Sequence, residues 1–189
     1  MRPTTLRWPQ AGIVPLSHTR DTAGPMARHV ADCVLLDGVI TGGPTEVTPS
    51  ALKGLRLGLP RDYFWENLDA ELAAILQAAL ARLREAGVVL VEGDVANVAA
   101  LAAAGFPIML YETVIELERY LAEHETGLDF ASLMAQVKSP SVKQALASLR
   151  GANAVSEAGY CEALTKHRPA LQEAYRRYFR EREIGRAHV

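Results

Sequence analysis

The stretch LRLGLPRDYFWENLDAELAAILQAALARLREAGVVLV, residues 55–91, holds two short apolar runs on either side of a helical pattern. Leu55–Leu59 and Val88–Val91 have the length and composition of strands. Between them, Asp69 is placed to cap a helix that Gly87 ends. The apolar side chains of this helix recur on one face: Leu72, Ile75, Leu76, Ala79, Leu80 and Leu83. A strand, a helix and a strand with short connections predict a βαβ unit whose strands are parallel neighbours.

The second run, Val88–Val91, is apolar without alternation, which is typical of a strand buried on both faces. Two strands alone do not make a stable sheet. We therefore expect an α/β fold, mostly helical, with a βαβ unit from a larger mixed sheet whose other strands lie outside this chain. The remaining pattern predicts further helices over residues 95–104, 107–124, 129–137, 140–149 and 154–182.

The N-terminal segment is expected to be an ordered loop followed by a helix. Proline and glycine are too dense in residues 1–25 for a long helix or a central strand. Gly24-Pro25 suits a first helical turn, and Asp21 and Thr22 can cap it. The helix is predicted over residues 25–41 and ends at Gly42-Gly43. One face is apolar apart from a single aspartate: Met26, Val30, Cys33, Val34, Asp37 and Ile40.

The composition is that of an ordinary globular protein, with 189 residues, 49% hydrophobic and 22% charged, and a net charge of −2. This balance gives no argument for binding nucleic acid or an anionic membrane. The apolar stretch Val98–Tyr111 contains Gly105 and Pro107 and falls short of the roughly 20 residues that span a bilayer, so we expect a buried helix pair. Cys33 and Cys161 are too few for a disulfide framework, and the N-terminus shows no signal-peptide pattern, so a cytoplasmic protein is expected.

Several short motifs carry a family resemblance. Arg2–Trp8 (RPTTLRW) and Gly12–Asp32 (GIVPLSHTRDTAGPMARHVAD) resemble the segment that follows the nucleophilic serine in amidase signature enzymes, and Leu55–Phe64 resembles the strand and loop that come next. Four motifs are most similar to indoleacetamide and mandelamide hydrolases: Trp8-Pro9, Ser17–Thr22, Tyr63-Phe64-Trp65 and Leu110-Tyr111-Glu112.

The resemblance implies hydrolysis of a small aryl or arylacetamide-type primary amide to acid and ammonia by a Ser–Ser–Lys triad. An unprotonated lysine acts through a bridging serine, and a second serine attacks the carbonyl. The chain contains no Gly-Gly-Ser or Ser-Ser motif, and none of its lysines matches a triad position: Lys53, Lys138, Lys143 and Lys166. We therefore expect residues 1–183 to be a partial amidase domain, inactive alone, with no catalytic, cofactor-binding or metal-binding residue.

The resemblance also marks one departure. The family normally has glycine where this chain has Leu6, just before Arg7. If that glycine has a positive φ, leucine strains the turn.

Some residues admit both a chemical and a structural interpretation. Ser17, His18 and Asp21 invite a Ser-His-Asp reading, but neighbours in sequence point different ways, so hydrogen bonding within the loop is favoured. Two pairs could line a substrate pocket or pack in the core, and both interpretations stay open: Tyr111 with Glu112, and Phe64 with Trp65.

Other candidate sites have simpler explanations. His124, His167 and His188 lack metal-ligand spacing. Cys161 is expected to be a buried thiol rather than a nucleophile, and Thr41-Gly42-Gly43 is expected to be a helix C-cap rather than a phosphate loop. The basic end of the last helix is expected to be a solvated amphipathic face: Arg176, Arg177, Arg180 and Arg182.

Two other functions compete with the amidase hypothesis. The chain could be a self-standing, non-catalytic α/β binding or interaction module, which would be compact. An amidase fragment should instead show a bare sheet edge and a large apolar patch. Within the family, the subunit that supplies ammonia on tRNA is a further option, which the Tyr63-Phe64-Trp65 likeness disfavours. The expected partner is a small-molecule amide in the full-length enzyme, with no nucleic acid and no membrane, and a homodimer stays open.

The last residues need a separate account. Residues 184–189, IGRAHV, are the translation of the sequencing adapter ATCGGAAGAGCACACGTC. We expect the native sequence to end near Arg182 and residues 184–189 to be a non-native tail from adapter read-through.

Overall fold

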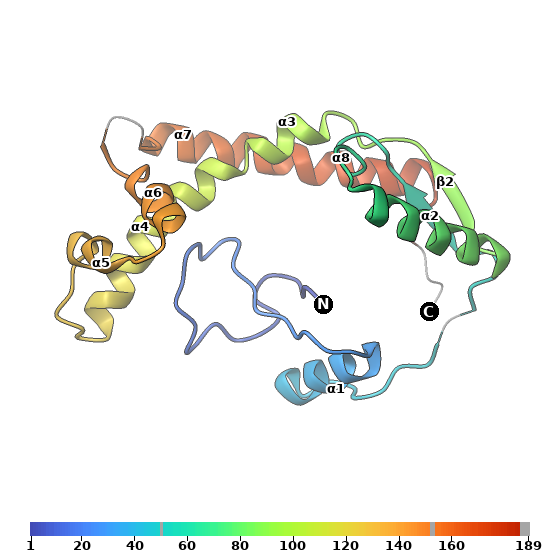
Figure 1. The fold of residues 1–189 in the computed structure, drawn as a ribbon, viewed down its shortest axis with the longest axis horizontal. Coiled ribbons are helices and arrows are strands. Elements are labelled where there is room, and N and C mark those ends of the chain that lie inside the picture. The colour runs from blue at the N-terminus through green and yellow to red at the C-terminus, as the bar shows by residue number, and fades with distance from the viewer. Residues whose placement is uncertain (50, 152–153, 186–189) are drawn as a thin grey trace. The chain divides into compact units, whose positions relative to one another are not determined.

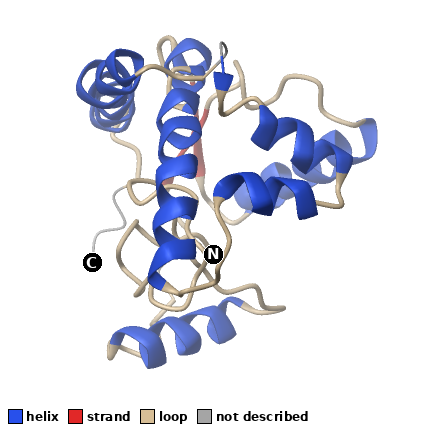
Figure 2. Cartoon of the chain, turned by 90° about the vertical axis from the view of Figure 1, so that its left-hand side faces the viewer, coloured by secondary structure: helices blue, strands red, loops and turns tan. Residues whose placement is uncertain are grey.

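The computed structural model describes residues 1–49, 51–151 and 154–185. The chain divides into two compact units, one made of Met1–Thr48 with Gly105–Leu164 and the other of Pro49–Ala104 with Thr165–Val189. Figure 1 gives the order of the elements, and Figure 2 colours helices, strands and loops separately.

The second unit contains the βαβ motif that the sequence predicts. Strands β1 (Arg56–Leu59) and β2 (Val89–Glu92) pair in parallel, with Arg56 opposite Val89. Helix α2 (Ala70–Glu85) connects them. The carboxylate of Asp69 accepts hydrogen bonds from the amides of Glu71 at 2.8 Å and Leu72 at 3.2 Å, which confirms the predicted cap.

Helices α3 (Val98–Ala103) and α8 (Arg168–Glu181) pack on each other in the same unit. Their contact is part of a buried apolar cluster made of Val95, Val98, Tyr178 and Ile184. Ile184 therefore packs in this core, and residues 186–189 of the expected non-native tail lie outside the described residues. Arg176, Arg177 and Arg180 of α8 are exposed, as predicted, and Arg177 pairs with Glu181 at 3.0 Å. Arg182 follows the helix and is instead half-buried, with its guanidinium 5.0 Å from the centre of the Tyr178 ring.

The expectation that the second strand is buried on both faces is wrong for this chain. Val89 is 43% exposed, and Leu57 on β1 is 38% exposed. Leu72 and Ile75 on the apolar face of α2 are also exposed. The physical reason is that the sheet has only two strands within the described residues, so the apolar side chains lack the layers that would cover them.

The first unit is helical. It contains α1 (Val30–Thr41), α4 (Phe106–Glu123), α5 (Phe130–Gln136), α6 (Pro140–Ala147) and α7 (Glu157–Glu162). Its buried apolar cluster consists of Leu117, Phe130 and Leu149. The helix predicted over 154–182 is interrupted, because the π-helical turn Ala163–His167 separates α7 from α8.

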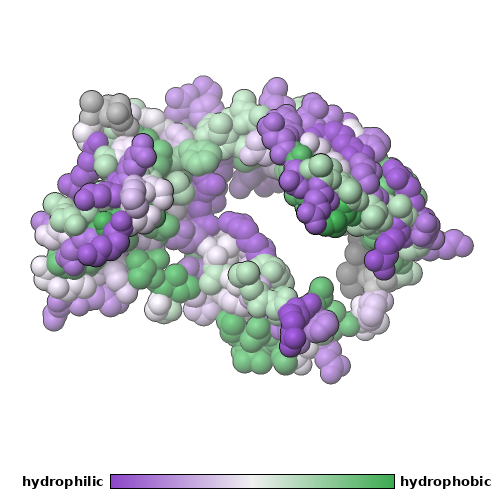
Figure 3. Space-filling model, viewed as in Figure 1, coloured by the Kyte–Doolittle hydropathy of each residue, from purple (hydrophilic) through white to green (hydrophobic). Residues whose placement is uncertain are grey.

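Helix α1 differs from the prediction in both its start and its burial. It begins at Val30 rather than at residue 25, and His29, in an extended conformation, precedes it without a side-chain cap. Met26 is 98% exposed, and Gly38 is the one buried residue of the helix. Figure 3 shows apolar side chains gathered over this helix. The C-terminal end is as predicted, with Gly42 at φ 68° and ψ 17°.

The aspartate on the apolar face of α1 has a specific role. Arg7 pairs with the Asp37 carboxylate through two nitrogens, and the indole nitrogen of Trp8 donates to it at 2.9 Å. The Arg7 hydrogen bond, with that of Trp8, lowers the pKa of Asp37 to about 2. This contact fixes α1 to the N-terminal loop.

The apolar stretch Val98–Glu123 is long and apolar enough to cross a membrane by length and composition alone. Such a stretch is weak evidence, because core helices of soluble proteins meet the same criteria. It contains two helices, as predicted, with the break at Ala104 and Gly105 between α3 and α4. Their burial is partial, since Phe106 and Ile115 are exposed.

The predicted strain at Leu6 is present, since its φ is +69°. An L side chain in this region costs about 1–2 kcal/mol, which glycine avoids at a smaller entropic cost. Leu6→Gly is expected to raise the free energy of unfolding by about 1 kcal/mol, measured by urea denaturation. Leu6→Ala is the matched control, because it keeps the Cβ and removes only an exposed side chain. Equal stability of the two variants would contradict the strain.

Candidate functional site

A buried carboxylate on α4 gathers the polar side chains of the first unit. Glu112 is 1% exposed. It accepts a short hydrogen bond from the Ser17 hydroxyl, one from Thr19 Oγ1 at 2.9 Å and one from Tyr160 Oη at 2.8 Å. The donors come from the N-terminal loop and from α7, so this one side chain connects three segments that are far apart in sequence. We call Glu112 and these three donors the Glu112 cluster.

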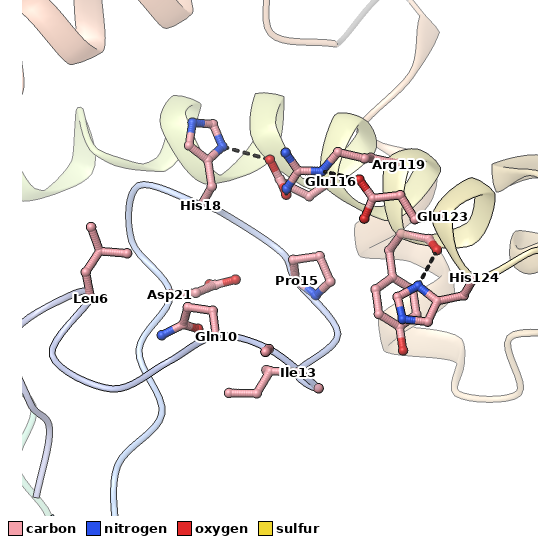
Figure 4. Close-up of a pocket in the computed structure, with 13 residues that line it drawn as sticks. Leu6, Gln10, Ile13, Pro15, His18, Asp21, Glu116, Arg119, Glu123 and His124 are labelled. Carbon is pink, nitrogen blue, oxygen red and sulfur yellow. Dashed lines mark hydrogen bonds and ion pairs between the residues drawn. The ribbon is translucent and has the colours of Figure 1, made fainter. Parts of the chain in front are cut away.

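A second buried carboxylate lies one helical turn further along α4. Glu116 is also 1% exposed, and its position four residues after Glu112 places both on one face of the helix. Its carboxylate accepts from His18 Nδ1 at 2.8 Å and from Arg119. Figure 4 shows His18 reaching from the loop to Glu116. The loop is therefore attached to α4 at two consecutive turns.

The hydrogen bonds decide the charge state of the Glu112 cluster. Burial acts to raise the pKa of Glu112, but the donors Ser17, Tyr160 and Thr19 together outweigh it and lower the pKa below its ordinary value. Burial and the hydrogen bond to Glu112 raise the pKa of Tyr160 to about 12. At neutral pH the cluster is thus an ionised carboxylate that accepts from neutral hydroxyls.

Ser17, His18 and Asp21 do not form a triad. The Ser17 hydroxyl is directed at Glu112, and the residue is 0% exposed, so no substrate reaches it. Asp21 accepts from the backbone amides of Leu16 at 2.7 Å and Ser17 at 2.8 Å, which shapes the turn. Asp21 therefore stabilises the loop and does not cap α1, which corrects the predicted cap. Thr22, the other predicted cap, donates to the Pro3 carbonyl at 3.4 Å instead.

An open pocket of about 320 Å³ lies beside Glu116, where His18 attaches the loop to α4. Figure 4 shows loop residues on one side and α4 residues on the other. The lining mixes apolar and charged groups: Leu6, Gln10, Ile13, Pro15, His18, Asp21, Glu116, Arg119, Tyr120, Glu123 and His124. His124 stacks on Tyr120, with ring centroids 4.0 Å apart, and bonds the Tyr120 carbonyl at 2.9 Å. Among the described residues that line this pocket, none is a nucleophile paired with a base.

The two pairs that could line a pocket or pack in the core differ in their outcome. Tyr111 stacks on Tyr160 at 4.3 Å, so the Tyr111-Glu112 pair packs within the first unit. In the second unit, Trp65 lies under the Arg61 guanidinium at 4.1 Å, and Phe64 is exposed beside an apolar groove.

The remaining candidates have these outcomes. The prediction of a buried Cys161 is wrong, because the residue lies on the exposed side of α7. Gly42 caps α1, as predicted for Thr41-Gly42-Gly43. Within the described ranges no group of His, Cys, Asp and Glu is arranged to hold a metal, and His188 lies outside them.

The sequence analysis did not predict that the N-terminal loop contacts the Leu110-Tyr111-Glu112 motif. Two glutamates four residues apart in the apolar stretch FPIMLYETVIELE, residues 106–118, are a signal that it overlooked. Carboxylates on the buried face of a helix need donors from elsewhere. The hydroxyls of the loop were candidates for that role.

Glu112→Gln is expected to lower the free energy of unfolding by about 2 kcal/mol at pH 7. The reason is that the NH₂ group of glutamine would face hydroxyl donors that stay buried. Since the folded pKa is lowered, the contribution of Glu112 is complete above its unfolded pKa of about 4.3 and is lost as pH falls through the folded value. The difference in free energy of unfolding between the unaltered protein and the Glu112→Gln variant should therefore shrink below about pH 4. Urea denaturation at both pH values measures it.

Glu118→Gln is the matched control on the same helix. Glu118 is exposed and pairs with Arg150 at the surface, so this change should cost less than about 1 kcal/mol. Equal losses in the two variants would contradict a special role for the Glu112 cluster.

Comparison with known proteins shows which family this chain resembles. A family model described as Amidase matches residues 1–184. The chain is 41% identical to the indoleacetamide hydrolase of Agrobacterium vitis over 180 residues, which cover 95% of this chain and 38% of that protein. It is 35% identical to the mandelamide hydrolase of Pseudomonas putida over 193 residues, 97% of this chain and 38% of that protein.

The fold agrees with a solved structure. The native peptide amidase from Stenotrophomonas maltophilia superposes with a TM-score of 0.64 and 28% identity, over 85% of this chain and 38% of that one. The chain thus spans 38% of the length of both curated relatives named above. On the strength of the match over residues 1–184 and these identities, the chain belongs to the amidase family.

Proposed function

We propose that this region is part of an enzyme that hydrolyses a carboxylic acid amide, a small aryl or arylacetamide-type primary amide, to acid and ammonia. The observation that carries the proposal is the identity to an indoleacetamide hydrolase and a mandelamide hydrolase over nearly the whole chain. Both names denote enzymes that act on amides of acids with an aromatic group.

The proposed chemistry uses a Ser–Ser–Lys triad that lies outside residues 1–189. In support, the sequence has no Ser-Ser or Gly-Gly-Ser motif, and Ser17, the one fully buried serine described here, is bound to Glu112. The chain alone is then inactive. The proposed location is the cytoplasm, which the low cysteine content of the chain, Cys33 and Cys161 alone, supports.

The contribution of this region is to hold the segment that follows the nucleophile. Loop residues Ser17–Thr19 are bound to Glu112 and Glu116 on α4, and Trp8 and Arg7 are bound to Asp37 on α1. A catalytic serine just before this loop would be attached to a backbone held at two places. Such rigidity matters because misplacing a reacting group by about 1 Å can cost on the order of 100-fold in rate.

The test is a chimera in which residues 1–183 replace the matched region of the Agrobacterium vitis indoleacetamide hydrolase. Ammonia release from indole-3-acetamide and mandelamide is measured for the chimera, for the parent enzyme and for the 189-residue chain. The chimera should release ammonia and the chain alone should not. A folded chimera without activity on either amide would contradict the proposed reaction, and turnover by the chain alone would contradict the missing triad.

A further inference from the structure

Leu6 combines a strained backbone with an exposed side chain. Its φ is +69°, in the left-handed region that glycine reaches without this strain. The side chain is 74% exposed, so burial within the first unit offsets little of the cost. Strained residues of this kind cluster at active sites and at sites that hold a ligand. The strain therefore indicates that the position of the Leu6 side chain serves a function.

The Leu6 side chain lines the pocket of about 320 Å³ beside Glu116, which lies within the first unit. Leu6, Ile13 and Pro15 give the loop side of this pocket an apolar surface. Figure 4 shows Leu6 on the left of the view and His124 on the right, with Pro15 between them. A side chain that packs on little of its own unit is thus held at the wall of a cavity.

The α4 side of the pocket carries an aromatic surface. His124 directly follows α4, and its ring stacks on that of Tyr120 with the centroids 4.0 Å apart. A hydrogen bond of 2.9 Å between His124 Nδ1 and the Tyr120 carbonyl fixes the imidazole. Tyr120 is half-buried and His124 is exposed, so one face of the imidazole is available to a further ring. Stacking is a preferred arrangement for such a pair of rings.

The charges that line the pocket favour an uncharged ligand. Arg119 pairs with Glu116, and its Nε lies 3.8 Å from Glu123. Asp21 accepts hydrogen bonds from two backbone amides of the loop. Three carboxylates against one guanidinium leave the lining without net positive charge even when both of its histidines are protonated. An anion is therefore disfavoured, whereas a neutral amide is not.

We propose that this pocket takes the aromatic group of the amide substrate, and that Leu6 and His124 determine specificity because their side chains contact that group. The class of ligand rests on the proposed function, and the pocket adds where this chain binds it. An aliphatic amide gains neither contact, and the carboxylic acid product meets the carboxylates of the lining. The pocket therefore selects for an aryl group in the substrate and against the charge of the product.

The binding test uses the 189-residue chain and indole-3-acetamide as the probe. In an NMR titration, the backbone amide signals of Leu6, Ile13 and His124 should move in a saturable way. Leu6→Ala should weaken binding about fivefold because part of an apolar contact is lost. His124→Ala should weaken it about fivefold because a ring contact is lost.

Leu16→Ala is the matched control for this titration. Leu16 is an exposed leucine of the same loop, and it is not among the described residues that line the pocket. Its removal should leave the affinity unchanged. Equal affinity of the Leu6 and Leu16 variants, or a titration without saturable shifts at the pocket, would overturn the proposal.

Leu6→Gly separates a binding role of Leu6 from a structural one. This variant removes both the side chain and the strain, so it should lose as much affinity as Leu6→Ala while it gains stability. Full affinity of Leu6→Gly would overturn the role of the side chain. The corresponding acid, indole-3-acetate, should bind about fivefold more weakly than the amide, and equal binding would contradict the selection against the product.

The chimera that tests the proposed reaction distinguishes failure of the pocket from failure of the reaction. In the chimera, Leu6→Ala should raise the KM for indole-3-acetamide about fivefold and leave kcat nearly unchanged, as expected for a contact made equally in the ground state and the transition state. Ammonia release with an unchanged KM would overturn the pocket but not the reaction. Saturable binding to the chain, with no ammonia release by the folded chimera, would contradict the reaction but not the pocket.

Discussion

The first unit depends on the ionised carboxylate of Glu112, a residue that is 1% exposed. A buried carboxylate is stable only if donors surround it, and here they come from the N-terminal loop and from α7. Glu116 repeats the arrangement one turn later with His18 and Arg119. Because the loop is dense in proline and glycine and forms no strand or long helix, these polar contacts, with those to Asp37, give it a defined conformation.

The second unit depends on an incomplete sheet. Its βαβ motif has the predicted Asp69 cap and parallel strands, yet Val89 and Leu57 are exposed because the sheet has two strands within the described residues. These exposed apolar side chains, with those of helix α1, support the proposal that this region is part of a larger domain. The match to 38% of the length of the two curated relatives agrees with that interpretation.

The parts of the fold that the sequence predicted correctly are those set by local rules. Asp69 caps α2 and Gly42 ends α1, each because of its immediate neighbours. The positive φ of Leu6 agrees with the glycine that the family has at this position. The predicted start and burial of α1 and the predicted burial of Cys161 were wrong. These properties depend on which surfaces meet in the folded protein. Within the Glu112 cluster, Ser17 and Glu112 are 95 positions apart, so no local pattern brings them together.

The central claim is that the Glu112 carboxylate holds the N-terminal loop on α4. Amide hydrogen exchange of the Glu112→Gln variant, read residue by residue, tests it most directly. We expect the amides of Ser17, Thr19 and Arg20 to lose protection, while those of β2, in the other unit, keep theirs. If the loop amides stay as protected as in the unaltered protein, Glu112 does not hold the loop.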